Sequence, residues 1–313
     1  MRNHDRQEES PVVVSDLTGF PEGYEKPFTD DPNYQPYKSK QLSYGNTFPG
    51  SYRGAIIRTI EWLTGKLTLI RLIRIYESTG RFPNQTFFSK ALELLKIELL
   101  TPMEQIKKIP KTGPIILVAN HPHGLVDGLI LAEFCERVRD DFKILTRELL
   151  NTIPEIQDHL LPVAFPHVEN SLKQNIAMRK AAMDHLAAGG VLVLFPAGQV
   201  ASAPSWFAPS LEATWNPFTA KLIRRSNARI LPVFFPGENS RLYHWANLIS
   251  PTLRQSLLLH EIAHSMKKSQ NPIIGDVIER EEVDNFKGTT EEFMSWLRAR
   301  TLALGNSNET EAA

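Results

Sequence analysis

The sequence predicts a single α/β domain in which helices flank a mixed, mostly parallel sheet. Three uninterrupted apolar runs, at residues 114–119, 191–195 and 229–235, each end at turn-forming residues, which is typical of buried strands. Between and beyond them lie segments with the apolar spacing of helices, at 125–138, 172–188 and 215–225. Because strands that alternate with helices build βαβ units, the order of these elements predicts the parallel pairing.

Weaker patterns complete the order of elements. We expect further strands at 96–100, 143–146 and 272–278, and further helices at 86–95, 251–268 and 290–303. Residues 1–50 are rich in Pro, Asp, Tyr and Lys without periodicity, which indicates an irregular arm. The domain itself would span residues 51–304, and the polar tail at 305–313 is expected to be disordered.

A long amphipathic helical pattern covers residues 53–78. Charged residues such as Glu61 and Arg71 interrupt its Ile and Leu residues, so it is not expected to cross a membrane. Two interpretations remain open. The segment can lie in an anionic lipid interface, which basic residues mixed with Trp and Leu favour, or it can pack on the core while its arginines extend to solvent.

The composition excludes several classes of protein. The 313 residues are 42% hydrophobic, which is enough for a substantial core, and Lys+Arg balance Asp+Glu at 35 each, so nothing indicates a nucleic-acid partner. The single cysteine, Cys135, excludes an intramolecular disulfide and fits a reducing compartment. Because the N-terminus lacks the apolar stretch of a signal peptide, we expect the protein to stay in the cytoplasm.

The first segment that contains candidate catalytic residues is Pro114–Gly128. Its apolar run stops at Asn120-His121, and Asp127 follows a Pro/Gly turn at the start of the next helix. His121 would therefore lie at the carboxyl edge of the sheet, where open α/β sheets bind ligands. A neutral imidazole there can take a proton from a hydroxyl while a carboxylate fixes its tautomer. The alternative is a surface histidine in a turn and an aspartate placed by the helix dipole.

A second segment, Gly189–Ser202, repeats this design. Its strand ends at Phe195-Pro196-Ala197-Gly198-Gln199, and a turn with Pro and Gly lets the backbone approach a ligand closely. The amides of such a turn can bind an anion or an oxyanion. Taken alone the signal is weak, because many strands end in turns of this kind.

Together the two segments resemble the glycerolipid (lysophosphatidic acid-type) acyltransferase family. That family carries an Asn-His motif ending in Asp after one strand and a Phe-Pro-x-Gly motif after a later one. The resemblance is closest to the hemolysin-like branch, which includes lyso-ornithine-lipid acyltransferases, and it covers about residues 53–280. It is supported by Phe195–Gly198, Trp215 ahead of a helix, Ile230–Ser240, the Leu-rich helix after Pro251 and the strand near Gly275.

The resemblance implies direct acyl transfer from a thioester to a lysolipid hydroxyl in membrane lipid biosynthesis. His121 matches the general base of the family and Asp127 its orienting partner, while the Phe195–Gly198 loop matches the segment that handles the polar head of the acceptor. Backbone amides near Gly124 or Gly198 would stabilise the oxyanion, and an apolar groove lined partly by the 53–78 helix would take the acyl chain. The residues expected to contact substrate are Asn120, His123, Gly124, Phe195, Pro196, Ala197, Gly198, Gln199, Glu238, Asn239 and Arg241.

The chain departs from the family pattern at two places. Five residues separate His121 from Asp127 instead of four, which makes His123 a rival base. The usual Glu-Gly-Thr-Arg after Phe-Pro is replaced by Ala197–Val200, and Leu161–His167 stands where another Arg motif is expected. Because a fork-shaped Arg clamps phosphate, its loss favours an acceptor other than a phosphomonoester. The basic residues that could compensate are Arg147, Lys173 and Arg179.

Two alternatives to an acyltransferase stay open. His260-Glu261-Ile-Ala-His264 fits the H-E-x-x-H pattern of zinc peptidases, with a third ligand to be sought among Glu279, Glu281 and Glu282. The same histidines also continue the apolar stripe of Leu257, as interface residues would, and the family resemblance makes Glu261 structural. A non-catalytic lipid-binding relative is the other alternative, because the Arg motifs are missing.

The sequence analysis thus predicts an O-acyltransferase that needs neither metal nor bound cofactor. Its acceptor would be a lysolipid, either 1-acylglycerol-3-phosphate or another lysophospholipid or lyso-ornithine lipid. Its other partners would be acyl-CoA or acyl carrier protein as donor, and a membrane surface. The expected location is peripheral, on the cytoplasmic face of the membrane.

Overall fold

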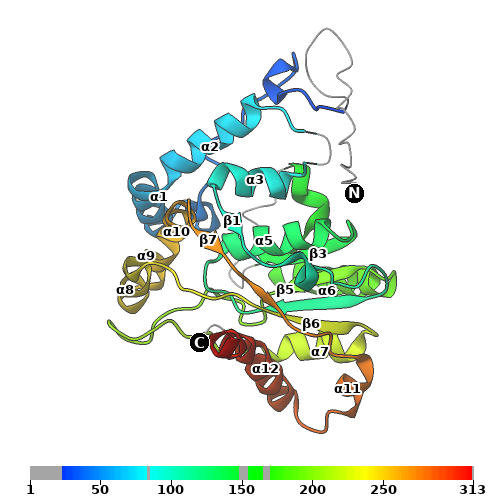
Figure 1. Ribbon diagram of the computed structural model, residues 1–313. Helices are drawn as coiled ribbons and strands as arrows, with labels where there is room; N and C mark the ends of the chain where they lie inside the picture. The colour runs from blue at the N-terminus through cyan, green and yellow to red at the C-terminus, as the bar shows by residue number, and fades with distance from the viewer. Residues whose placement is uncertain (1–22, 83–84, 148–153, 165–169, 312–313) are drawn as a thin grey trace, which may run out of the picture.

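The computed structural model describes residues 23–82, 85–147, 154–164 and 170–311, and a six-stranded sheet forms its centre (Figure 1). The strand order is β4-β3-β5-β2-β6-β8. The neighbouring pairs from β4 to β6 are parallel, and only the edge strand β8 runs antiparallel, to β6. The predicted mixed, mostly parallel sheet is therefore confirmed. The bounds of its strands are β2 Ile115–Ala119, β3 Phe142–Arg147, β4 Leu160–Val163, β5 Val191–Leu194, β6 Arg229–Phe234 and β8 Ile273–Ile274.

The register brings the two motif segments to one edge of the sheet. Val118 of β2 pairs with Leu194 of β5, and Ala119 pairs with Val233 of β6. The residues that follow these three strands therefore leave the sheet side by side at its carboxyl edge, where parallel sheets place their ligands.

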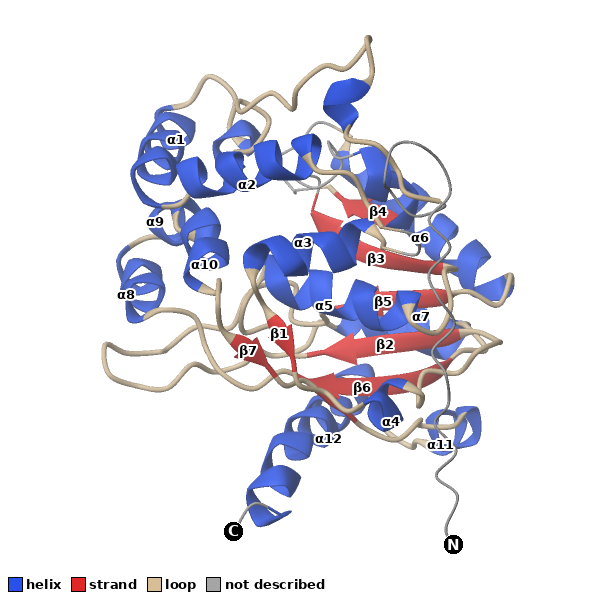
Figure 2. Cartoon of the chain, turned by 45° about the horizontal axis from the view of Figure 1, so that its top comes forward, coloured by secondary structure: helices blue, strands red, loops and turns tan. Residues whose placement is uncertain are grey.

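Helices cover both faces of the sheet (Figure 2). Alternate residues of β2 point to opposite faces, as strand geometry requires: Ile115 and Leu117 belong to one apolar cluster, Ile116 and Val118 to the other. The first cluster includes residues of α3 (Phe87–Leu95) and α5 (Leu125–Glu136). The second includes residues of α6 (Ser171–Ala187), α7 (Pro217–Arg225), α11 (Arg280–Asn285) and α12 (Thr290–Glu311).

The predicted helix at 53–78 is two helices, α1 (Tyr52–Thr64) and α2 (Lys66–Ser78). The break is at Gly65, where an added Cβ would lie 2.6 Å from the carbonyl oxygen of Leu259. The backbone of α10 (Leu258–His264) thus packs directly against this residue. The expected helix at 251–268 is likewise split, into α9 (Pro251–Ser256) and α10.

Several elements differ from the sequence-based expectation. The edge strand β4 was not predicted, because it is short and contains Pro162. Within the range 272–278 the structure has only the two-residue strand β8, and β7 (Ser269–Gln270), which pairs with β1 (Glu98–Leu99), was not predicted. The helices α4 (Met103–Ile106), α8 (Arg241–Ile249) and α11 were also not predicted. Helix α12 continues through Glu311, so the tail expected to be disordered from residue 305 is helical up to that point.

The described part of the arm, residues 23–50, is irregular apart from the short 3-10 helices η1 (Phe28–Asp30) and η2 (Tyr44–Thr47). It packs on α2, where the Tyr37 amide donates to Glu77 Oε1 at 2.6 Å and the Arg74 guanidinium donates to the Tyr37 carbonyl at 2.9 Å. The rest of the expected arm, residues 1–22, lies outside the described residues. No helix in the described part of the chain has the length and apolar character needed to cross a bilayer.

Candidate active site

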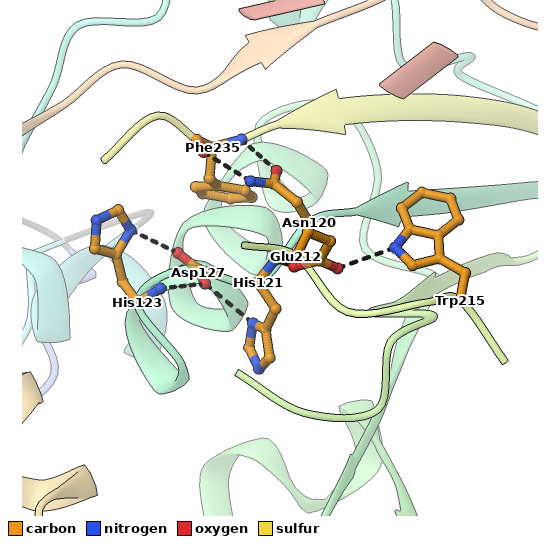
Figure 3. Close-up of polar contacts among 7 residues, drawn as sticks. All are labelled: Asn120, His121, His123, Asp127, Glu212, Trp215 and Phe235. Carbon is orange, nitrogen blue, oxygen red and sulfur yellow. Dashed lines mark hydrogen bonds and ion pairs between the residues drawn. The ribbon is translucent and has the colours of Figure 1, made fainter. Parts of the chain in front are cut away.

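The structure brings His121 and Asp127 into contact at the carboxyl edge of the sheet (Figure 3). His121 follows β2, and Asp127 lies in the first turn of α5. Gly124 stands between them with a φ of +66°, a conformation that favours glycine, and this lets the chain turn from strand to helix. The distance from His121 Nδ1 to Asp127 Oδ2 is 3.0 Å, and the Asp127 side chain has no exposed surface.

A second imidazole contacts the same carboxylate. The His123 amide donates to Asp127 Oδ2 at 2.9 Å, and His123 Nδ1 lies 3.1 Å from Oδ1. Burial by itself would raise the pKa of Asp127, but the hydrogen bonds from His121 and His123 outweigh it, so the pKa lies below its usual value. Asp127 is therefore an ionised acceptor that holds both rings by their Nδ1 atoms.

Exposure distinguishes the two histidines. The side chain of His121 is 16% exposed and that of His123 only 7%. A Cβ added at Gly237 would lie 3.0 Å from His123 Nε2, so this nitrogen faces the backbone of the loop after β6. His121 is thus better placed than His123 to receive a proton at Nε2 from a bound molecule. The additional residue between His121 and Asp127 is accommodated in the turn.

Residues distant in sequence hold His121 in place. Its amide donates to Glu212 Oε2 at 3.1 Å, and its carbonyl accepts from the Ala201 amide at 2.8 Å. The Trp215 indole donates to Glu212 Oε1 at 2.9 Å. Burial raises the pKa of Glu212, against the opposing effect of the Trp215 and His121 hydrogen bonds. Sequence analysis missed Glu212, because no local motif marks a residue that acts through a contact 91 positions away.

Phe195 gives His121 its other contact. The Phe195 ring stacks on the imidazole with a centroid distance of 3.9 Å and an angle of 21°. The next residues form a turn closed by a hydrogen bond of 2.9 Å from the Gly198 amide to the Phe195 carbonyl. The Phe195–Gly198 segment therefore lies beside the candidate base, as predicted. The Gly198 amide is engaged in the turn, however, which leaves the start of α5 near Gly124 as the better source of oxyanion donors.

The side chain of Asn120 connects two loops of the protein. Its Nδ2 donates to the Phe235 carbonyl at 2.8 Å, and its Oδ1 accepts from the Phe235 amide at 2.7 Å. Asn120 was predicted to contact substrate, but its amide is committed to these two bonds. Its role in the structure is to fix the loop after β2 against the loop after β6.

Glu238 and Arg241, also predicted to contact substrate, hold a neighbouring loop. Arg241 Nη2 lies 3.1 Å from Glu238 Oε1, Glu238 Oε2 accepts from the Ser210 amide at 2.8 Å, and Arg241 Nη1 donates to the Ala208 carbonyl at 2.7 Å. Asn239, which lies between these two residues in the sequence, is buried. Within the described part of the chain, its side-chain nitrogen and oxygen have no hydrogen-bond partner.

The H-E-x-x-H segment is structural. Glu261 is buried and accepts from the Ser240 amide at 2.8 Å and from its hydroxyl at 2.6 Å, which ties α10 to the start of α8. His260 and His264 stack at 6.0 Å. No group of three His, Cys, Asp or Glu side chains suited to a metal occurs among the described residues, so Glu279, Glu281 and Glu282 supply no third ligand. The zinc-peptidase hypothesis is not supported.

Among the basic residues considered as substitutes for the missing Arg motifs, the structure describes the side chains of Arg179 and Lys173. Arg179 packs its guanidinium 4.3 Å from the centre of the Phe218 ring, and Lys173 is exposed on α6. Arg147 ends β3, but its side chain lies outside the described residues, as do residues 165–167 of the Leu161–His167 segment.

An apolar cavity of about 570 Å³ begins next to the motif. Leu125, which follows Gly124, and Leu129 line it from α5, and α2 contributes Leu69, Leu72 and Tyr76. Segment 28–42 of the arm closes another side. The predicted groove lined by the 53–78 region is therefore present.

Part of the chain matches a known protein family. Residues 102–235, which contain both motifs, match the sequence model of the family described as Acyltransferase. A search of curated proteins gave no match. One solved structure, the 1-acyl-sn-glycerophosphate (LPA) acyltransferase PlsC from Thermotoga maritima, is similar over 88% of this chain and 95% of that chain, with 14% sequence identity and a TM-score of 0.47. Residues 102–235 are thus similar to the Acyltransferase family, and this match supports an O-acyltransferase activity.

Proposed function

We propose that the protein transfers a fatty acyl chain from an acyl thioester to the hydroxyl of a lysolipid. The observation that supports this most directly is the 3.0 Å contact between His121 Nδ1 and the buried Asp127 carboxylate. Because Nδ1 is held by the carboxylate, Nε2 is the nitrogen that can accept a proton.

The reaction would proceed in one displacement. His121 Nε2 takes the proton of the acceptor hydroxyl while the oxygen attacks the thioester carbonyl, and Asp127 stabilises the imidazolium. Backbone amides at the start of α5, near Gly124, stabilise the oxyanion. Collapse of the intermediate breaks the carbon–sulfur bond, and the imidazolium returns its proton to the departing thiolate. The products are the acylated lipid and the free thiol of coenzyme A or acyl carrier protein.

The acceptor is proposed to be a lysolipid other than a phosphomonoester. The Phe195–Gln199 turn beside His121 contains no Arg, and Arg179 is engaged with Phe218. A bidentate guanidinium clamp for a terminal phosphate is therefore not formed by these residues. This favours lyso-ornithine lipid, or a lysophospholipid whose phosphate is a diester, and agrees with the hemolysin-like branch of the family.

The apolar cavity is proposed to hold an acyl chain. It starts at Leu125, one residue after the turn that carries the proposed oxyanion donors, so a chain inside it would place its carboxyl end near His121. Each methylene taken from water into such a cavity contributes about 0.8 kcal/mol to binding. We further propose that the protein works as a peripheral enzyme on the cytoplasmic face of a membrane, with α1 at the lipid interface.

The direct test is transfer of a labelled acyl group from acyl-CoA or acyl carrier protein to a panel of lysolipids. The unmutated protein should acylate at least one acceptor, and Asp127→Asn should lower the rate by about 10²-fold or more, since an amide cannot stabilise the imidazolium. A lipid profile of cells lacking and overproducing the protein would name the acceptor by the lysolipid that accumulates. Lipid binding without turnover of either donor would contradict the proposal.

A further inference from the structure

The loop at residues 201–211 has an unusual surface. It contains no charged residue, and Pro204 and Pro209 bound a segment in which Trp206 is 49% and Phe207 is 89% exposed. Leu211, at the end of the loop, is also exposed. Large apolar side chains presented together in this way are typical of a binding surface rather than of ordinary solvent exposure.

The loop is fixed to the protein by hydrogen bonds to its backbone. The Ala208 carbonyl accepts from Arg241 at 2.7 Å, the Ser210 amide donates to Glu238 at 2.8 Å, and the Trp206 carbonyl accepts from the Trp245 indole at 2.9 Å. All three contacts use main-chain atoms of the loop, so its exposed aromatic side chains are presented on a held backbone.

The loop continues an apolar side of the molecule. It projects next to α8, on the same side as α1 (Figures 1 and 2). Both helices expose large apolar residues: Leu242, Trp245 and Ile249 on α8, and Tyr52, Ile56, Trp62 and Leu63 on α1.

The charges on this side favour an anionic partner. The carboxylates of α1, α2 and α10 are all buried, namely Glu61, Glu77 and Glu261. Arg53 and Arg58 of α1 are exposed, whereas Arg241 of α8 is paired with Glu238. Tryptophan at the level of lipid head groups, with arginine beside it, is the composition of a membrane-interface surface.

We propose that the 201–211 loop docks on an anionic lipid surface by inserting Trp206 and Phe207. The loop is also joined to the catalytic base at both ends, through the hydrogen bond from the Ala201 amide to the His121 carbonyl and that from the His121 amide to Glu212. Docking through this loop therefore sets the height of the His121 imidazole above the lipid. The inference rests on the proposed function only in that the acceptor is a lipid.

The test uses the full-length protein with Phe207→Ser and with the double variant Trp206→Ser/Phe207→Ser. Binding is measured by co-sedimentation with vesicles of phosphatidylglycerol and phosphatidylcholine, and with vesicles of phosphatidylcholine alone. The matched control is Leu172→Ser, because Leu172 is 74% exposed on α6, and α6 lies on the other side of the molecule from α8 and the loop in Figures 1 and 2. Melting temperatures verify that the variants fold, which is expected because the loop contacts use main-chain atoms.

Phe207→Ser should weaken binding to anionic vesicles by about tenfold and the double variant by more, whereas Leu172→Ser should not change it. Unchanged binding of the double variant would overturn the proposal, as would self-association through the loop with no affinity for vesicles. Acyl transfer to a short-chain lysolipid dispersed below its micellar concentration should be the same in all variants. If the unmutated protein showed no acyl transfer, the proposed function would be contradicted, but the vesicle-binding result would still stand. Failure of the docking proposal is therefore distinguishable from failure of the proposed function.

Discussion

The two imidazoles that share Asp127 provide the sharpest test of the site. We expect His121→Asn and His123→Asn to have very different effects, although both rings contact the same carboxylate within 3.1 Å. In each variant the Asn amide keeps a donor where Nδ1 stood, so the buried charge of Asp127 stays hydrogen-bonded. The matched pair therefore isolates the role of Nε2.

Removing the Nε2 base of His121 should cost the full contribution of general-base catalysis, about 10²- to 10⁴-fold in rate. This corresponds to about 3 to 5.5 kcal/mol in the activation free energy. His123 Nε2 faces Gly237, so His123→Asn should remove no proton acceptor and change the rate by no more than about tenfold.

The assay is release of the free thiol from the acyl donor in the presence of lysolipid, with a melting curve for each variant. The reasoning would be refuted if His123→Asn abolished transfer while His121→Asn retained it. Equal large losses with unchanged melting temperatures would show that the two rings act as one unit, which would also contradict the separate roles inferred here.

Four other changes test the cavity, the support of His121, a buried carboxyl and the helix break. Leu72→Trp should fill part of the 570 Å³ cavity and shift the preference toward shorter acyl donors, measured by competition between donors of different length. Glu212→Gln puts an NH₂ group opposite one of the two N–H donors that Glu212 accepts from, so it should destabilise the protein by about 1–3 kcal/mol. Both the melting temperature and the transfer rate should fall. Wild-type values for both would contradict the role of Glu212 in supporting His121. Burial raises the pKa of Glu136 from 4.5 to about 7. Between pH 4.5 and about 7, the folded protein therefore keeps a proton on this carboxyl group that the unfolded chain has lost. Stability should therefore fall as pH rises from about 4.5 to 7 through this group, and Glu136→Gln should remove that part of the fall in denaturant midpoints. Gly65→Ala should destabilise the protein by about 1–3 kcal/mol in chemical unfolding, because its Cβ would meet the Leu259 backbone.

The order of elements and the position of the candidate catalytic pair were predictable because they depend on local pattern. Apolar runs that end in turns indicated β2, β5 and β6, and parallel pairing then brought their ends to one edge. His121 and Asp127 are six positions apart across a strand–turn–helix unit, so short-range geometry alone makes their contact accessible. The sequence of residues 201–211 shows that the segment is uncharged, but its exposure is known only from the structure.

Only the tertiary structure decided which side chains remain available for chemistry. Asn120 is committed to Phe235, 115 positions away, and Glu261 to Ser240, so two residues with motif-like positions are structural. Glu212 supports His121 from 91 positions away and carries no local signal. The break at Gly65 is likewise set by the backbone of α10. A sequence pattern encodes the period of an element and the spacing within it, whereas the partner of a buried polar group is chosen by whichever segment folding brings within hydrogen-bond distance.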